Sequence, residues 1–169
     1  MFNVLPVQSY INLHHLTSFS EEWEKRQEHI REAIKYVIPC DVNQENPLAP
    51  RVFEPFDVIT SCLCLEAGAC ADETTYRKAV KHVSRLLKPG GFLFIFGVHG
   101  QSFYTVGEES FSTFSTSVEI VESALSDAGL ANFRWCNDDV DEVLFEQTCK
   151  KLNIRADYTG IFAISAKKQ

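Results

Sequence analysis

The chain has 169 residues, 45% of them hydrophobic and 23% charged, which is typical of one globular domain with a sizeable core. Its formal net charge of −7 argues against nucleic acid and anionic membrane as partners, because both are recognised by cationic surfaces. The sequence has no apolar run long enough to span a bilayer, and the first residues lack the pattern of a secretion signal. We therefore expect a cytoplasmic protein.

Six cysteines are spread through segments that look like strands and helices. In a chain without a secretion signal, this distribution favours reduced and mostly buried thiols over a disulfide framework. No second pair stands at the spacing of a zinc site, so we predict no metal ion. The cysteines are Cys40, Cys62, Cys64, Cys70, Cys136 and Cys149.

The first third of the chain predicts two helices, a strand and a loop. Apolar residues at helical spacing indicate a helix over 4–16. Ser18 and Glu21 have the spacing of a capping box that opens a second helix over 21–35. Its apolar side is formed by Trp23, Ile30 and Ile34. The run "YVIPC" predicts a strand over 36–40, and three prolines in residues 43–55 indicate a loop.

The middle of the chain predicts a strand, a helix and a second strand. The run "FDVITSCLCL" at 56–65 is apolar on both faces, as in a buried parallel strand. The helix over 72–87 directs Tyr76, Val80, Val83 and Leu87 inward. In "SRLLKPGGFLFIFG" the proline stops that helix and the glycines allow a sharp turn into an apolar strand over 91–97.

The last third predicts a hairpin or loop excursion and then four further elements. Thr116 and Glu119 form another capping box, whose helix runs to Asp127 and stops at Gly129. A strand over 131–137, a helix over 138–152 and a final strand over 160–168 follow. The excursion occupies residues 100–114.

Strands that alternate with helices predict a parallel, doubly wound α/β sheet. Ligands of such sheets bind at the carboxyl ends of the strands. The candidate site therefore comprises residues 40–42, 62–68 and 97–104.

Four segments together resemble class I S-adenosylmethionine-dependent methyltransferases, with a Rossmann-like sheet. They are "CDVNQENPLAP", "FDVITSCLCLEA", "YRKAVKHVSRLLKPGGFLFIFG" and "SFYTVGEESF". Within that class the chain is similar to the nicotinamide, phenylethanolamine and indolethylamine N-methyltransferases, to which "CLEA" and "FYTVGE" are specific. The similarity covers nearly the whole chain and is weakest over 137–156. It implies S-adenosylmethionine as the cofactor and a small-molecule amine as the substrate.

The resemblance implies a role for several residues at the predicted strand ends. Asp41 would accept from the exocyclic amine of adenine, Val42 would meet the adenine through its backbone or by packing, and Cys62 would pack beside the cofactor. Glu66 would be the catalytic-site anion that holds a cationic amine, directly or through water. The other residues implied at the acceptor site are Leu63, Gln101, Phe103 and Tyr104, with Asp157 as a weaker second acid.

The residues alone leave plainer interpretations open. Asp41 has the character of a capping or loop carboxylate, and Glu66 that of an acid favoured near a helix N-terminus. Phe103 and Tyr104 also suit ordinary apolar cover.

Two features depart from the family pattern. The nicotinamide-specific branch has an aspartate where this chain has Gly97, and Gln101 stands where the amine-methylating branch offers an acid. Gly97 removes the carboxylate that recognises the amide of nicotinamide, and the amine-methylating branch also has glycine at that point. The resemblance therefore disfavours nicotinamide and leaves an arylalkylamine open as the acceptor. The family's Asp-x-Gly-x-Gly-Pro loop and the acid that binds the ribose are also missing, and no Gly-x-Gly occurs in the sequence.

Residues 1–169 are accordingly expected to form a partial methyltransferase domain, without the glycine-rich-loop strand and its neighbour. The 36–40 strand would then have no neighbour in the strand at 57–63, whose apolar edge would be exposed. The function expected of the complete polypeptide is N-methylation of a small molecule, and the chain alone should be weak or inactive. The alternative is a non-catalytic remnant that binds a protein partner through the exposed edge. A nicotinamide-dinucleotide oxidoreductase is disfavoured, because its glycine fingerprint is missing.

Overall fold

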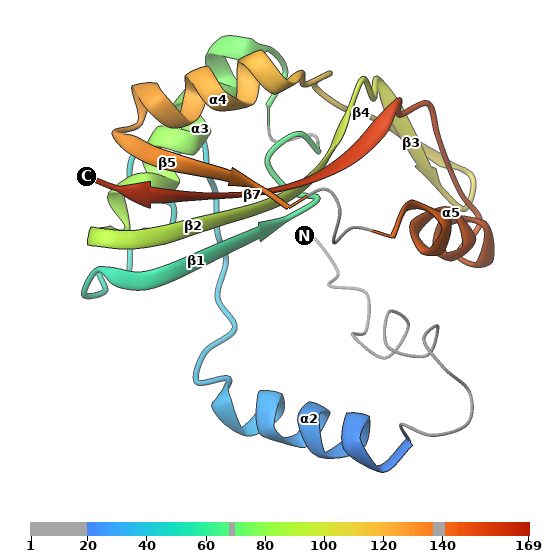
Figure 1. The fold of residues 1–169 in the computed structure, drawn as a ribbon, viewed down its shortest axis with the longest axis horizontal. Coiled ribbons are helices and arrows are strands. Elements are labelled where there is room, and N and C mark those ends of the chain that lie inside the picture. The colour runs from blue at the N-terminus through green and yellow to red at the C-terminus, as the bar shows by residue number, and fades with distance from the viewer. Residues whose placement is uncertain (1–19, 68–69, 137–140) are drawn as a thin grey trace.

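The computed structural model describes residues 20–67, 70–136 and 141–169, and its body is a four-stranded sheet (Figure 1). The elements in chain order are α2 (Ser20–Ala33), β1 (Phe56–Cys62), α3 (Glu73–Arg85), β2 (Leu87–His99), β3 (Phe103–Val106), β4 (Glu109–Ser112), α4 (Val118–Asp127), β5 (Leu130–Trp135), α5 (Glu142–Lys151), β6 (Ile154–Ala156) and β7 (Gly160–Lys168). The predicted helix over 4–16 and the capping box at Ser18 lie outside the described residues.

The main sheet has the strand order β1-β2-β7-β5 and is mixed, so the prediction of a parallel sheet is wrong. Only the pairing of β1 with β2 is parallel, and β7 pairs antiparallel with both β2 and β5. The reason lies in where β7 enters the sheet. It begins at Gly160, opposite His99 at the end of β2, and therefore runs back along β2.

A second, smaller sheet has the order β4-β3-β6 and lies beyond the end of β2 (Figure 1). The predicted excursion over 100–114 is confirmed as the β3–β4 hairpin, in which Phe103 faces Ser112. Tyr104 of β3 is in register with Ala156 of β6. This pairing joins the hairpin to the segment that leads into β7.

Helix α3 follows the predicted apolar pattern, but it ends at Arg85, so Leu87 and the following proline belong to β2 and the proline does not stop the helix. It begins after Asp72, whose carboxylate accepts from the backbone N–H of Thr75 at 2.8 Å, and such a cap satisfies a free helix donor. Its apolar side chains, among them Tyr76 and Val80, are buried. The following turn needs its glycines, since Gly90 has a φ of +80° and a Cβ on Gly91 would lie 3.0 Å from the carbonyl oxygen of Asp57.

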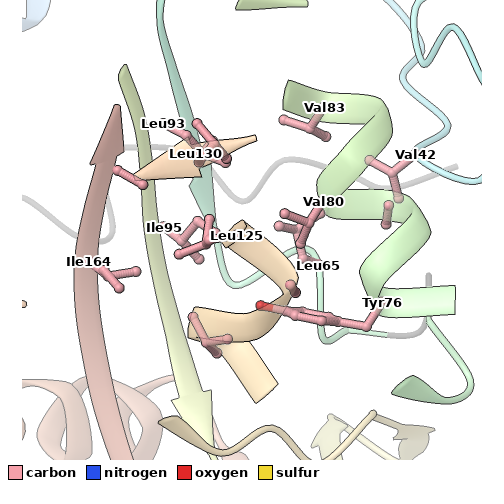
Figure 2. Close-up of a cluster of buried hydrophobic side chains, with 14 of the residues drawn as sticks. Val42, Leu65, Tyr76, Val80, Val83, Leu93, Ile95, Leu125, Leu130 and Ile164 are labelled. Carbon is pink, nitrogen blue, oxygen red and sulfur yellow. The ribbon is translucent and has the colours of Figure 1, made fainter. Parts of the chain in front are cut away.

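The hydrophobic core lies between α3, α4 and one face of the main sheet (Figure 2). In this view Tyr76 and Val80 of α3 point toward Leu125 of α4, with Ile95 of β2 and Ile164 of β7 on the sheet side. Burying such side chains stabilises the fold by roughly 1.5–3 kcal/mol each relative to leaving them exposed. The two helices and the sheet face therefore form one continuous core.

The opposite sheet face is partly open, so the prediction that β1 and β2 are buried on both faces is wrong. Val58 is 53% exposed, and Phe92 and Phe94 are each 41% exposed. Val58 is in register with Phe92, which places these side chains on the face away from the core. Helices α3 and α4 lie together on the other face (Figure 1).

The segment before β1 also differs from prediction. Residues 36–40 form no strand, because none of the described strands pairs with them. The predicted apolar side of α2 is not buried at Ile30, and Ile34 beyond the helix is also exposed. In α4 the cap is Ser117 instead of Thr116, since the Ser117 hydroxyl accepts from the N–H of Ile120.

Candidate active site

The ends of β1 and β2 meet at one edge of the sheet, because these two strands are parallel. Cys62, the last residue of β1, is in register with Phe96 of β2. Leu63 follows with a φ of +47°, and its N–H donates to the carbonyl of Phe96 at 2.9 Å. This left-handed residue turns the chain sharply at the predicted site.

Glu66 lies in the interior just beyond that turn. It is only 2% exposed, and its backbone carbonyl accepts from the N–H of Phe114 at 2.9 Å. Its Oε1 atom has no hydrogen-bond partner among the described residues. That atom faces Gly97, because a Cβ built on Gly97 would lie 3.0 Å from it.

Burial raises the pKa of Glu66 from 4.5 to about 7, although the backbone N–H groups of Glu66 and Val98 act in the opposite direction. Desolvation disfavours the carboxylate, so this side chain exchanges a proton near neutral pH. A buried carboxyl with one unpartnered oxygen has the chemistry to pair with a cation or to accept a proton.

Gln101, Phe103 and Tyr104 lie at the start of the hairpin, as predicted. Gln101 is buried, and its carbonyl accepts from the hydroxyl of Thr113 at 2.9 Å. Phe103 is exposed, whereas Tyr104 stacks on Phe111 with the ring centroids 5.2 Å apart. Burial raises the pKa of Tyr104.

Asp157 contacts this same segment. Its Oδ1 accepts from the N–H groups of Ser102 and Phe103, at 2.8 and 3.1 Å, and its Oδ2 accepts from the hydroxyl of Ser102 at 2.5 Å. The hydroxyl bond from Ser102, followed by the backbone bonds, lowers the pKa of Asp157.

Of the three residues predicted to bind cofactor, Asp41 is exposed, Val42 is buried and Cys62 is the last residue of β1. Asp41 is exposed, and its carboxylate accepts from the N–H of Asn43 and from Nε2 of Gln44, both at 3.0 Å. The Gln44 bond is the main reason that the pKa of Asp41 is lowered. Val42 is buried, and its carbonyl lies 2.9 Å from Nδ1 of His82 on α3.

A cavity of about 440 Å³ lies between residues 36–53 and β1. Val42 and Cys62 line it, so the structure brings these two predicted residues together. Sequence reasoning missed the aromatic side of the cavity, formed by Tyr36, Phe53 and Phe56, whose neighbouring ring centroids lie 6.0 Å apart. Tyr36 and Phe56 were expected in separate strands and Phe53 in the loop between them, so nothing indicated that the three rings meet.

All six cysteines are free, as predicted, but the prediction that most are buried is wrong. Only Cys70 is buried, and Cys62 and Cys64 are exposed near the end of β1. Partial desolvation raises the pKa of both exposed thiols, and it raises that of Cys70 to about 12. These thiols are therefore protonated at neutral pH and are weak nucleophiles.

His99 is a further polar group that sequence reasoning missed. Its ring stacks on Phe162 at a centroid distance of 4.3 Å, and its buried Nε2 has no partner among the described residues. Burial lowers the pKa of His99. A single histidine in an apolar strand carries no signal of such an environment.

The described parts of the chain contain no group of three or more histidine, cysteine or acidic side chains able to hold a metal ion. They also contain no helix with the length and apolar character needed to cross a membrane.

Known proteins similar to this chain cover most of it. Human nicotinamide N-methyltransferase is 37% identical over 85% of this chain and 51% of its own length. Rabbit (Oryctolagus cuniculus) indolethylamine N-methyltransferase is 33% identical over 88% of this chain and 53% of its own length. The chain thus spans about half the length of these relatives.

Solved structures with a similar fold are more distant in sequence. An S-adenosylmethionine-dependent methyltransferase from Clostridium acetobutylicum superposes with a TM-score of 0.52 at 17% identity, over 88% of this chain and 72% of that one. A didemethyltoxoflavin N1-methyltransferase from Burkholderia thailandensis gives a TM-score of 0.50 at 17% identity, over 88% and 56%. The model of the NNMT/PNMT/TEMT family matches residues 2–169, and the chain belongs to this family of class I S-adenosylmethionine-dependent methyltransferases.

Proposed function

We propose that the complete polypeptide to which this chain belongs transfers a methyl group from S-adenosylmethionine to a small amine in the cytoplasm. The observation that carries the proposal is the family match over residues 2–169. The names of the relatives, which state N-methylation of nicotinamide, indolethylamine and phenylethanolamine, support an amine acceptor.

The residues present fit the adenine end of the cofactor. Asp41 offers an exposed carboxylate with acceptor capacity beyond its two hydrogen bonds, and Val42 and Cys62 line an apolar cavity suited to a flat ring. When bound, the sulfonium of S-adenosylmethionine supplies an activated methyl group. The proposed roles of Asp41, Val42 and Cys62 are to bind and orient the adenine.

Glu66 is the proposed anion of the acceptor site. With a pKa of about 7, it can take a proton from an ammonium group at Oε1, which leaves the amine neutral and nucleophilic. The interior position excludes water and strengthens this interaction. Leu63, Gln101, Phe103 and Tyr104 are proposed to shape the acceptor site, and the role of Asp157 is argued below.

Gly97 is proposed to disfavour nicotinamide as the acceptor. A side chain there would meet the ring of Phe162 at 2.8 Å and Oε1 of Glu66 at 3.0 Å, so an aspartate has little room. A second carboxylate beside Glu66 would also raise the cost of ionising either group. An arylalkylamine is therefore the proposed substrate class.

The chain as given is proposed to lack the strand with the glycine-rich loop, and the strand next to it. In support, β1 is an edge strand of the described sheet, and the side chain of Val58 on its open face is exposed. No residues of this sequence supply the loop for the methionine end of the cofactor. Each missing charge-assisted contact is worth about 1.5–3 kcal/mol, so the chain alone should bind S-adenosylmethionine weakly.

The same exposed edge favours a second candidate function, a protein-interaction module without catalysis. An unpaired apolar edge is a template on which another strand adds. Under this function the chain would capture an extended segment at β1 and would have no measurable affinity for the cofactor.

Calorimetric titration with S-adenosylmethionine separates the two functions. We expect weak heat from this chain and clear binding by the same chain extended with coding sequence upstream of Met1 that supplies a glycine-rich loop. In the extended enzyme, Glu66→Gln should weaken amine acceptors more than the cofactor, and Glu109→Gln on exposed β4 is the matched control. No heat from either polypeptide up to millimolar ligand would refute methyl transfer.

A further inference from the structure

The loop between β2 and β3 carries Gln101 and leads into Phe103, two residues proposed for the acceptor site. Hydrogen bonds hold this loop from two sides. On one side, the N–H of Gly100 donates to the carbonyl of Thr116 at 3.1 Å, and the N–H of Thr113 donates to the carbonyl of Ser102 at 2.9 Å. The opposite side is formed by the segment that joins β6 to β7.

Asp157, in the segment between β6 and β7, makes three of the hydrogen bonds to the loop from this second side. It follows Ala156, the last residue of β6, so it stands just past the β3–β6 ladder. Its carboxylate binds three donors of the loop, two backbone N–H groups and one hydroxyl, and both donor residues lie more than fifty positions earlier in the chain. Thr159 adds a bond from its N–H to the carbonyl of His99 at 2.8 Å.

These contacts occupy most of the hydrogen-bond acceptor positions of the Asp157 carboxylate. An ionised carboxylate has about four acceptor positions, and three are occupied by Ser102 and Phe103. An amine that paired with Asp157 would have to compete with these donors and would release the loop. The carboxyl of Glu66 keeps one oxygen free for an amine, since its Oε1 is unpartnered among the described residues.

We infer that Asp157 is a positioning residue, which fixes the loop that presents Gln101 and Phe103, and that it is not the counter-ion of the acceptor amine. Only one part of the inference rests on the proposed function, namely that this loop lines the acceptor site. The hydrogen bonds between Asp157 and the loop are present in the structure whatever the function is.

Amide hydrogen exchange on the 169-residue chain tests the positioning role without any need for activity. Asp157→Ala should speed exchange at the amides of Ser102 and Phe103 on the order of tenfold, because both lose their acceptor. Asp157→Asn keeps one side-chain oxygen for these N–H groups and should restore most of the protection. Asp72→Ala removes a carboxylate with similar contacts at the start of α3 and should leave both amides unchanged.

Three results would overturn the inference. They are unchanged exchange in Asp157→Ala, exchange in Asp157→Asn as fast as in the alanine variant, and an equal response to Asp72→Ala. If Asp157→Ala does not fold, Ser102→Ala serves in its place. It removes only the hydroxyl donor, and it should speed exchange at both amides by a smaller factor, so that unchanged exchange again contradicts the inference.

The extended enzyme tests the second half of the inference. For a positioning residue, Asp157→Asn should keep the KM of the amine near that of the wild type, whereas Asp157→Ala raises it. For a counter-ion, Asn and Ala should raise KM alike, because both remove the charge. An inactive extended enzyme would refute the proposed function, but the hydrogen-exchange result on the 169-residue chain would still decide whether Asp157 positions the loop.

Discussion

Replacing Glu66 by glutamine should change how the stability of the chain depends on pH. Burial raises the pKa of Glu66 from 4.5 to about 7 in the folded chain. Between these two values the folded state binds more protons than the unfolded state, so the free energy of unfolding falls as pH rises. At roughly 1.36 kcal/mol per pH unit, the loss approaches about 3 kcal/mol above pH 7.

The Glu66→Gln variant has no proton to exchange at this position, so it should lack that loss. It should gain up to about 3 kcal/mol relative to the wild type at pH 8. Below about pH 3.5, where Glu66 is protonated in both states, the two proteins should be closely matched.

Urea unfolding, followed by far-ultraviolet circular dichroism at pH 5 and pH 8, measures this difference. Taking the difference between variant and wild type cancels contributions from other groups, such as His99, whose lowered pKa has the opposite sign. Glu109→Gln on β4 is the exposed control and should keep the wild-type profile. Parallel profiles for wild type and Glu66→Gln would show that the buried carboxyl is not the source of the pH dependence.

Two further substitutions test the packing around the site and the open sheet face. Gly97→Ala places a Cβ 2.8 Å from a buried aromatic ring and should lower the free energy of unfolding by about 1–3 kcal/mol, whereas Gly160→Ala, with nothing within 4 Å, should have little effect. Equal thermal unfolding of the two variants would contradict this account of the site. Val58→Lys should reduce concentration-dependent association in sedimentation velocity, and Val143→Lys on exposed α5 should not. Association that persists unchanged in Val58→Lys would mean that the β1 face is not responsible.

Features encoded by neighbouring residues were predictable from the sequence. Helix α3 shows this best, because the apolar spacing of Tyr76, Val80 and Val83 is a local signal and all three side chains are buried in the structure. The β3–β4 hairpin was predictable for the same reason, and the end of α4 before Gly129 agrees with the glycine rule.

Features that depend on distant partners were not predictable. An apolar run does not state the direction of its strand, so the antiparallel entry of β7 was missed. The strand expected over 36–40 failed because a strand needs a neighbour, and the described sheet provides none there. The interior position of Glu66 depends on the left-handed turn at Leu63, which leucine does not signal.

The place of β7 in the sheet has a consequence for synthesis of the chain. This strand is the last of the described elements in sequence, yet it lies between β2 and β5. While residues 160–168 are still inside the ribosome, β5 has no strand to pair with and β2 lacks one of its two neighbours. The sheet can therefore close only after residues 160–168 have left the ribosome, and until then the nascent chain must keep its apolar strands from associating.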